Sequence, residues 1–535
     1  MSRFPTDRGP EAFLAAYEAR VRPLRRKHGE TYWRFAIGHG GGLQSRLEEL
    51  ENQLSALHAD PAAYEALARW SAESHPPLVA RQVQLLLPEF RQNQVDEALR
   101  ARIIRLGLEV EEAYGKHRPV VDGEVMSSNQ LDRELLKGRD DRRRRLVWEA
   151  TRDIGREVRD TVIELVEARN ELARELGFSD YFALELANQE MDPDALFGLL
   201  DQLREATDAP WARQKAALDA EVARERGKAP GELMPWDYPD RFLQSVPRHD
   251  VGRSTDLFFT LRAIKKNTRG FYRSIGLPID DLWTVADLLP RDGKSPHAFC
   301  IGIDNPSDVR VLCNLDATSR WMETSLHEFG HAVYNAGISE DLPWVLREAA
   351  HTFITEAVAM FFGRLPKTRP WLENVAGVPA SIAAHAQAAL AEAQLVFARW
   401  VLVVTNFERE LYRDPRQDLE SRWWELVEDI QGLRRPDGWD APDWASKIHL
   451  ACYPVYYQNY LLGELLASQF RAAIARRTGQ EEAEATYAGR PEVGAFFAGL
   501  FSDGQKQRWD DAVRSHTGWP LQPDHWVRQF APPGA

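Results

Sequence analysis

The chain has 535 residues, of which 44% are hydrophobic and 28% are charged, so it can bury a large core. Its formal net charge of −14 argues against nucleic acid or an anionic membrane surface as a partner, because both attract basic proteins. Its three cysteines, Cys300, Cys313 and Cys452, are too few for a disulfide framework.

The N-terminal segment lacks the apolar core of a signal peptide. The longest apolar run, Leu395–Val404, is interrupted by Arg399 and is far too short to span a membrane. We therefore expect a soluble, cytoplasmic protein without a membrane partner. No repeat or linker-like segment is visible, so we expect residues 1–535 to form one unit. The sequence does not fix the oligomeric state, and a monomer is compatible with it.

Apolar residues recur at helical spacing through most of the chain, which predicts a mainly α-helical protein. The clearest long helix is expected over Asp141–Leu176, where Gly177 supplies a stop. Other helices are predicted, in chain order, over Leu43–His58, Val95–Tyr114, Asp192–Arg226, Asp256–Ile275, Ala380–Tyr412, Gln417–Ile430 and Tyr453–Arg477.

Two short strands interrupt this helical pattern. The segments His297–Ile301 and Val309–Leu312 have the composition of short β-strands. The turn residues Asp304, Asn305 and Pro306 lie between them. The edge strand of such a hairpin can pair with an extended peptide. A purely structural hairpin is compatible with the same pattern.

The segment Thr324–Leu365 contains His327, Glu328 and His331 in the pattern H-E-x-x-H. On a helix, positions four apart share one face, so both imidazoles can reach one ion. Glu328 is rotated away from that pair but can contact a water molecule at the ion. The arrangement is typical of a zinc hydrolase with one Zn²⁺ per chain. The same short pattern also occurs by chance on helices that bind no metal.

Catalytic zinc usually takes a third protein ligand. The next predicted helix, Val345–Phe362, offers Glu348 and Glu356, which lie roughly on one face. Their spacing alone does not choose between them. Glu356 is favoured because it is surrounded by apolar residues, where an unpaired carboxylate is costly. Glu348 is then interpreted as a carboxylate that supports the ligands from the second shell or stabilises the fold.

Hydroxyls and possible cations gather near the end of the chain. Lys447 and His449 are followed by Tyr453, Tyr456, Tyr457 and Tyr460. Buried tyrosines at helical spacing are more often core residues with a satisfied hydroxyl than catalytic groups. The residues alone leave both interpretations open.

Five segments carry a resemblance to a known family. In chain order they are HAFCIGIDNPSDVRVLCN, HEFGH, LPWVLREAAHTFITEA, WWELVEDIQG and KIHLACYPVYYQNY. From about residue 130 onward the chain resembles the angiotensin-converting-enzyme family of zinc peptidases, which are gluzincins. The resemblance implies a mainly helical, two-lobed ellipsoid with a small hairpin beside the zinc helix, and a deep central channel that admits peptide substrates.

The resemblance also implies roles for individual residues. It supports His327, His331 and Glu356 as ligands of the single zinc ion, and Glu328 as the general base. It matches His449 to a histidine that supports the tetrahedral intermediate and Tyr460 to a tyrosine that donates to the oxyanion. Four further residues match substrate-binding positions, two for the C-terminal carboxylate of the peptide and two for its extended backbone: Lys447 and Tyr457, and His297 and Ala298.

The chain departs from the family pattern at several places. The interval from His331 to Glu356 is one residue longer than usual and equals that of thimet-oligopeptidase-like enzymes. The family binds the terminal carboxylate partly through a glutamine after a tryptophan, whereas Asp237 follows Trp236 here. Gln458 and Asn459 stand where the family often has a chloride-binding arginine, which predicts weak chloride dependence.

Three functions stay open at this stage. The first is a peptidyl-dipeptidase that releases C-terminal dipeptides by attack of a zinc-activated water. The second is an oligoendopeptidase that cuts internal bonds of short peptides. The third is an inactive peptide-binding protein on a peptidase fold, against which the intact Glu328 and the complete ligand set argue.

Overall fold

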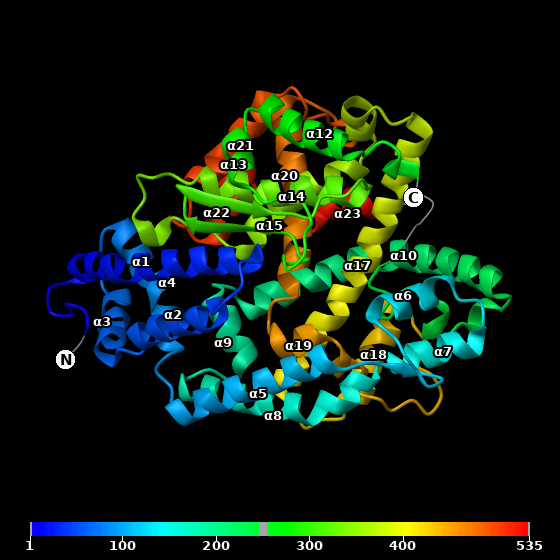
Figure 1. The fold of residues 1–535 in the computed structure, drawn as a ribbon, viewed down its shortest axis with the longest axis horizontal. Helices are drawn as coiled ribbons and strands as arrows, with labels where there is room; N and C mark the ends of the chain where they lie inside the picture. The colour runs from blue at the N-terminus through cyan, green and yellow to red at the C-terminus, as the bar shows by residue number, and fades with distance from the viewer. Residues whose placement is uncertain (1–2, 246–253, 533–535) are drawn as a thin grey trace. The chain divides into compact units, whose positions relative to one another are not determined.

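The structure is a computed structural model that describes residues 3–245 and 254–532. It is predominantly helical, with two short antiparallel hairpins in the described ranges, which confirms the expected fold class (Figure 1). Contacts divide the chain into two compact units. The first unit comprises Met1–Gln94, His249–Gln387 and Leu462–Gln522, and the second comprises Val95–Arg248, Ala388–Leu461 and Pro523–Ala535.

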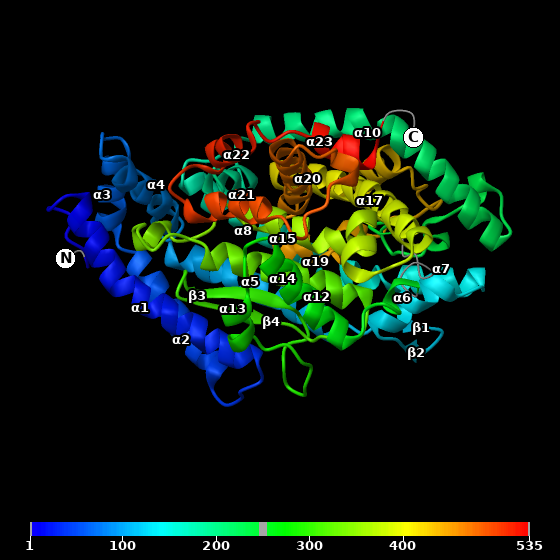
Figure 2. The ribbon, with the colours of Figure 1, turned by 90° about the horizontal axis from the view of Figure 1, so that it is seen from above.

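The first unit begins with four helices, of which α1 and α2 run side by side (Figure 2). These helices are α1 (Pro10–Ala36), α2 (Leu43–His58), α3 (Pro61–Ser71) and α4 (Pro77–Arg91). The remaining elements of this unit are α12 (Leu261–Ser274), α13 (Asp280–Val285), β3 (Phe299–Asp304), β4 (Asp308–Leu312), α14 (Ser319–Ala336), α15 (Thr352–Arg364), α16 (Arg369–Trp371), α21 (Pro491–Ser502) and α22 (Trp509–Thr517).

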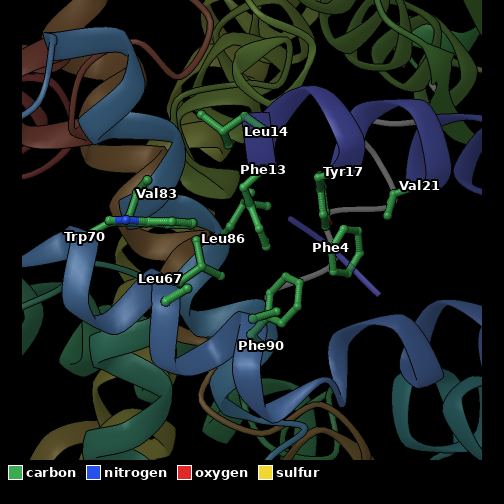
Figure 3. Close-up of a cluster of buried hydrophobic side chains, with 12 residues drawn as sticks. Phe4, Phe13, Leu14, Tyr17, Val21, Leu67, Trp70, Val83, Leu86 and Phe90 are labelled. Carbon is green, nitrogen blue, oxygen red and sulfur yellow. The ribbon is translucent and has the colours of Figure 1, made fainter. Parts of the chain in front are cut away.

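An aromatic cluster holds the N-terminal helices of the first unit together. Phe13 and Tyr17 of α1 point toward Trp70 of α3 and Phe90 of α4 (Figure 3). Phe13 and Phe90 are fully buried, and the Phe13 and Trp70 rings meet edge to face with centroids 5.5 Å apart. Each such side chain contributes about 1.5–3 kcal/mol through burial, so this cluster stabilises the helix group strongly.

The predicted hairpin is confirmed, with shifted strand ends. β3 pairs with β4 in antiparallel register from Phe299 opposite Leu312 to Asp304 opposite Asp308. The first strand therefore starts two residues later than expected and runs further, so that His297 and Ala298 precede it. On the other side of β4, the Asp287 N–H donates to the Val311 carbonyl at 2.8 Å. β3 consequently forms the outer edge of the hairpin, and both strands pack against α14.

The second unit is built from long helices, with α5 packed along α8. Buried leucines of both helices, including Leu99, Leu106 and Leu165, form its core there. Its elements are α5 (Glu97–Lys116), β1 (Val120–Val121), β2 (Glu124–Val125), α6 (Ser128–Lys137), α7 (Asp141–Ala150), α8 (Asp153–Glu175), α9 (Tyr181–Asn188), α10 (Pro193–Arg226), α18 (Leu419–Leu426), α19 (Ile448–Cys452) and α23 (Asp524–Phe530).

The prediction of one helix over Asp141–Leu176 is wrong, because α7 ends at Ala150 and α8 starts at Asp153. Arg152, at the break, is only 3% exposed. Its guanidinium lies over the rings of Trp148 and Phe242, 4.7 and 4.1 Å from their centroids, and donates to the Arg241 carbonyl at 2.5 Å. The buried partners of Arg152 thus accompany a kink that helical periodicity alone does not indicate.

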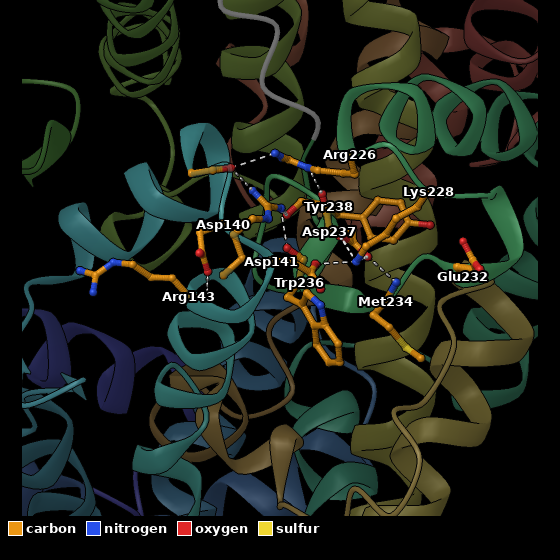
Figure 4. A network of polar contacts seen from close by, with 12 residues as sticks. Asp140, Asp141, Arg143, Arg226, Lys228, Glu232, Met234, Trp236, Asp237 and Tyr238 are labelled. Atoms are coloured by element: carbon orange, nitrogen blue, oxygen red, sulfur yellow. Dashed lines mark hydrogen bonds and ion pairs between the residues drawn. The ribbon is translucent and has the colours of Figure 1, made fainter.

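An ion pair between the partly exposed Lys228 and the buried Asp237 holds the loop after α10. The Asp237 carboxylate is fully buried and accepts from the Lys228 ammonium at 2.9 Å and from the Met234 N–H at 2.8 Å (Figure 4). Trp236 packs against Trp148, with ring centroids 5.8 Å apart. The Trp236–Asp237 pair therefore has structural partners inside the second unit.

Two further long helices are α17 (Ala380–Arg413) and α20 (Gln458–Thr478). Among the described residues, α17 alone is long and apolar enough by composition to cross a membrane. The apolar run Leu395–Val404 was expected to be too short to span a membrane, but the helix that contains it is long enough. However, 61% of its most apolar window is buried in the folded chain, as in the core helix of a globular protein. α20 starts five residues later than predicted, so Tyr453 and Tyr457 precede it.

Candidate metal centre and tyrosine cluster

Helix α14 presents two imidazoles on one face. The helix starts after Thr318, whose Oγ1 accepts from the Trp321 N–H at 3.3 Å and caps its first turn. His327 and His331 follow one turn apart on this helix, and their rings meet edge to face with centroids 4.9 Å apart. The predicted placement of both histidines on one helical face is confirmed.

Two glycines let α15 approach α14 closely. A Cβ on Gly330 would lie 2.9 Å from the Ala359 Cα, and a Cβ on Gly363 would lie 3.2 Å from the His327 Cβ. Real Cβ atoms rarely tolerate such distances, so larger side chains at these positions would separate the helices. The close contact brings the α15 residue Glu356 to the histidines.

The helix that carries Glu356 is shorter than predicted. The expected helix over Val345–Phe362 is wrong at its start, because α15 begins at Thr352 after a separate turn at Trp344–Leu346. The His351 Nδ1 accepts from the Phe353 N–H at 3.1 Å and caps α15 there. Glu348 thus lies outside the helix, whereas Glu356 lies within it.

The three predicted ligands form a cluster that fits zinc. Nitrogen atoms of His327 and His331 and a carboxylate oxygen of Glu356 all lie within 4.8 Å of one another. The Glu356 Oε2 lies 3.7 Å from the His327 Nε2 and 3.8 Å from the His331 Nε2. A tetrahedral ion bound at about 2.0–2.1 Å separates its ligand atoms by about 3.3 Å, so small movements suffice to bind it.

A further residue orients one of the imidazoles. The His331 Nδ1 lies 2.8 Å from the Thr355 Oγ1, on the neighbouring helix α15. With Nδ1 engaged as a donor to this hydroxyl, the Nε2 lone pair of His331 faces the cluster. A partner of this kind is typical of metal-binding histidines, because it fixes the tautomer and the ring orientation. The pattern of the sequence did not indicate Thr355.

Burial dominates the electrostatics of the cluster. It lowers the pKa of His327 to about 4 and holds the pKa of His331 well below its usual value, so both imidazoles are neutral and able to bind a metal. It raises the pKa of Glu356 to about 7. Burial, and next the charge of Glu356, raise the pKa of Glu328 to about 8. A dication at this place would favour the ionised form of both carboxyls.

Glu348 lies in the wall of a polar cavity of about 470 Å³ in the first unit. Its Oε2 accepts from the Asn305 Nδ2 at 3.0 Å. Burial raises the pKa of Glu348 to about 7, against the smaller effects of the Arg25 charge and the Asn305 hydrogen bond. The predicted role of Glu348 beside the metal ligands stays a prediction.

The two residues matched to the substrate strand lie just before β3. His297 is exposed, and its N–H donates to the Ser295 Oγ at 3.4 Å, while Ala298 is half-buried. Both continue the direction of the outer strand of the hairpin toward its N-terminal end. Their contact with a substrate stays a prediction.

In the second unit, His449 and two tyrosines form a ring cluster. The His449 ring meets the Tyr457 ring edge to face at 5.1 Å, and the Tyr457 and Tyr460 centroids are 5.4 Å apart. The Trp400 Nε1 donates to the Tyr457 hydroxyl at 2.7 Å, which leaves the phenolic hydrogen for another acceptor. Burial, then the Lys447 charge, lower the pKa of His449 to about 4, so its ring is neutral near pH 7.

Lys447 has a neighbour that the sequence analysis missed. The Lys447 Nζ donates to the Gln244 Oε1 at 2.9 Å and lies 5.2 Å from the centre of the Tyr457 ring. Burial lowers the pKa of Lys447 to about 8, against the opposing charge of Asp240. A buried ammonium, an amide and a phenol thus lie together in the second unit. This donor set suits a carboxylate.

A turn closed by the Asp240 side chain fixes the position of Gln244. The Asp240 Oδ1 accepts from the N–H groups of Phe242 and Gln244, each at 3.0 Å, and the Gln431 Nε2 donates to the Phe242 carbonyl at 3.0 Å. Asp237, and not a glutamine, follows Trp236, as the sequence analysis noted, but Gln244, eight residues after Trp236, was overlooked. An aspartate four residues before a glutamine in a Pro-rich loop is the local turn signal that could have located it.

One family model matches this chain over most of its length. The model described as angiotensin-converting enzyme covers residues 5–208 and 254–530. The matched ranges include the His-His-Glu cluster, Glu328, and the His449, Tyr457 and Tyr460 cluster.

Proposed function

The chain belongs to the angiotensin-converting enzyme family of zinc peptidyl-dipeptidases, and we propose that it removes dipeptides from the carboxyl ends of short peptides. The observation that carries this proposal is the cluster of His327, His331 and Glu356, with Glu328 on the same helix as the two histidines. The donor set, two imidazoles and one carboxylate, is that of a catalytic zinc site with an open position.

Each of these residues has a proposed task in the reaction. A zinc ion held by His327, His331 and Glu356 would polarise the scissile carbonyl and acidify a water molecule. The Glu328 carboxylate takes a proton from the attacking water and delivers it to the departing amine nitrogen. The Tyr460 hydroxyl, with His449, donates to the oxygen that becomes negatively charged.

We propose that the donors in the second unit choose the cleavage site. The Lys447 ammonium, the Gln244 amide and the Tyr457 hydroxyl bind the terminal carboxylate of the peptide, and this contact selects the bond two residues from the end. A carboxylate that accepts from a cation and two neutral donors is held more strongly than an uncharged terminal amide. The residues His297 and Ala298 support the peptide backbone in an extended form beside β3.

Product analysis tests this function. The purified protein is incubated with a pool of peptides that carry either a free carboxyl or an amidated C-terminus, with and without a zinc chelator, and the products are identified by mass spectrometry. We expect dipeptides from the free-carboxyl peptides only, and none with chelator. Internal cuts at equal rates in both sets would favour an oligoendopeptidase. No hydrolysis by protein with one bound zinc per chain would favour a peptide-binding role.

A further inference from the structure

Val455 has a backbone conformation that β-branched residues rarely adopt. Its φ of 51° lies in the left-handed region, and the residue is fully buried. It lies in the short segment between His449 and Tyr457. Such a conformation persists only where the surrounding structure holds it, and it often occurs near functional residues.

Side chains from three places bind both polar groups of Val455. Its N–H donates to the Glu408 Oε1 at 2.7 Å. Its carbonyl accepts from the Gln189 Nε2 at 2.9 Å and from the Gln458 Nε2 at 2.8 Å. Glu408 is a buried residue of α17, and Gln189 directly follows α9. Side chains from α17 and from the end of α9 therefore hold the two peptide groups that flank the Val455 Cα, one on each side.

Gln189 is itself fixed and also contacts the start of α20. The next residue, Glu190, has a φ of 56°, and the Met191 N–H donates to the Leu186 carbonyl at 2.8 Å, which closes the end of α9. The Asn459 Nδ2 donates to the Gln189 Oε1 at 3.0 Å. The Gln189 amide thus links the Val455 turn to the first turn of α20.

The clamped segment leads directly into the tyrosines. Tyr457 is the second residue after Val455, and Tyr460 lies in the first turn of α20, which starts at Gln458. The Asn459 and Tyr460 N–H groups donate to the carbonyls of Tyr456 and Tyr457. A rotation of the Val455 peptide would therefore change the direction of both phenols.

We propose that Glu408 and Gln189 are positioning residues for peptide hydrolysis, which hold the Val455 turn and thereby aim the Tyr460 hydroxyl at the oxyanion. This inference rests on the role proposed above for Tyr460. Neither residue is required to touch the substrate. Their effect on the reaction passes through the backbone of residues 455–460.

Matched variants separate positioning from general destabilisation. Glu408→Ala removes the acceptor of the Val455 N–H. Glu408→Gln keeps an acceptor oxygen, and because burial raises the pKa of Glu408 to about 8, a neutral amide is a close substitute near pH 7. Glu420→Ala is the control, because it removes a carboxylate of the same unit that binds Arg159 at 2.6 Å.

A double-mutant cycle with Tyr460→Phe tests the coupling. We expect Glu408→Ala to lower kcat about tenfold or more with little change in KM, and Glu408→Gln and Glu420→Ala to stay within about twofold of the parent. In the Tyr460→Phe background, Glu408→Ala should change kcat by less than about twofold, since the aimed hydroxyl is already absent. An equal loss in both backgrounds would overturn the inference.

Hydrogen exchange gives a readout that does not depend on activity. We expect the amide of Val455 to lose protection in Glu408→Ala and to keep it in Glu408→Gln and Glu420→Ala. Gln189→Ala, which leaves the Glu408 contact intact, serves if Glu408→Ala does not fold. Unchanged protection in the folded alanine variant would overturn the clamp. A parent protein that shows this protection pattern but hydrolyses no peptide would overturn the proposed function instead.

Discussion

Gly330 of α14 faces Ala359 of α15 so closely that a Cβ on the glycine would lie 2.9 Å from the Ala359 Cα. The ligands of the proposed zinc ion come from these two helices, two from α14 and one from α15. The distance between the helices therefore sets the distance between the Glu356 carboxylate and the imidazoles. Glycine at this position is required by packing and, through packing, by metal binding.

We predict that Gly330→Ala weakens zinc binding. The added methyl group forces the helices apart, which costs about 1–3 kcal/mol in stability and withdraws Glu356 from the histidines. We expect zinc affinity to fall roughly tenfold or more, as measured by competition with a chelator of known affinity. Gly270→Ala is the control, because a Cβ there meets nothing within 4 Å. Unaltered affinity in Gly330→Ala would show that α15 can shift without loss of the ligand.

A second prediction concerns Glu328, which is only 7% exposed beside the ligands. Glu328→Gln preserves the shape of the side chain but removes the group that accepts the proton of water. We expect kcat to fall by about 10²–10⁴ while each chain still binds one zinc ion. Metal analysis and peptide kinetics on the same sample check both parts. Loss of zinc together with activity would instead identify Glu328 as a structural support of the ligands.

A third prediction concerns Lys447 and Gln244, whose Nζ and Oε1 atoms lie 2.9 Å apart. If both bind the terminal carboxylate, Gln244→Ala should raise KM for free-carboxyl peptides by about tenfold, the value of one lost hydrogen bond to a charged group. The rate for amidated peptides should not change. Gln431→Ala provides a comparison, because Gln431 holds the same loop without facing Lys447. A parallel increase in KM for both peptide types would argue against carboxylate recognition.

The sequence predicted those site residues whose signal is local in the chain, and missed those whose partners are distant in sequence. His327 and His331 were predictable because one helix determines their spacing, and Glu356 because a carboxylate among apolar residues needs a partner. Gln244 and Glu408 were not predictable in the same way. Their partners, Lys447 and Val455, lie far away in sequence, so only tertiary packing brings them together.

Two predicted helix boundaries were wrong for a related reason. Helical periodicity runs across the kink before Arg152 and across the turn before Thr352, since both breaks keep apolar residues buried. The partners that accompany these breaks, such as the Trp148 and Phe242 rings around Arg152, leave no local pattern. The fold class was robust because it depends on the sum of many periodic segments.

A fourth prediction concerns chloride. Gln458 and Asn459 stand where the family often has a chloride-binding arginine, and their amide nitrogens donate to the Val455 carbonyl and to the Gln189 side chain. These contacts engage the local donors with protein acceptors. We expect kcat/KM to change by less than about twofold when acetate replaces chloride at constant ionic strength. Activation of several fold by chloride alone would contradict this explanation.

The last prediction concerns the pH dependence of stability and Glu408. This side chain is 1% exposed and lies near Arg169 and Tyr412, and burial raises its pKa to about 8 despite the Val455 hydrogen bond and the Arg169 charge. Below its unfolded pKa of about 4.3 the acid is protonated in both states and has no effect on the pH slope. Between about pH 4.3 and pH 8 the unfolded chain releases this proton and the folded chain keeps it, so the group lowers stability as pH rises.

The slope from one proton is about 1.4 kcal/mol per pH unit, and it ends once the folded state also ionises. Glu408→Gln removes this term while it retains an acceptor for the Val455 N–H. We therefore expect the unfolding free energy of Glu408→Gln, relative to the parent, to increase steadily from pH 5 to pH 8 in urea titrations. Glu420→Gln is the matched comparison, since this carboxylate pairs with Arg159 and is more accessible. A constant difference between parent and Glu408→Gln would mean that Glu408 is ionised in the folded protein throughout this range.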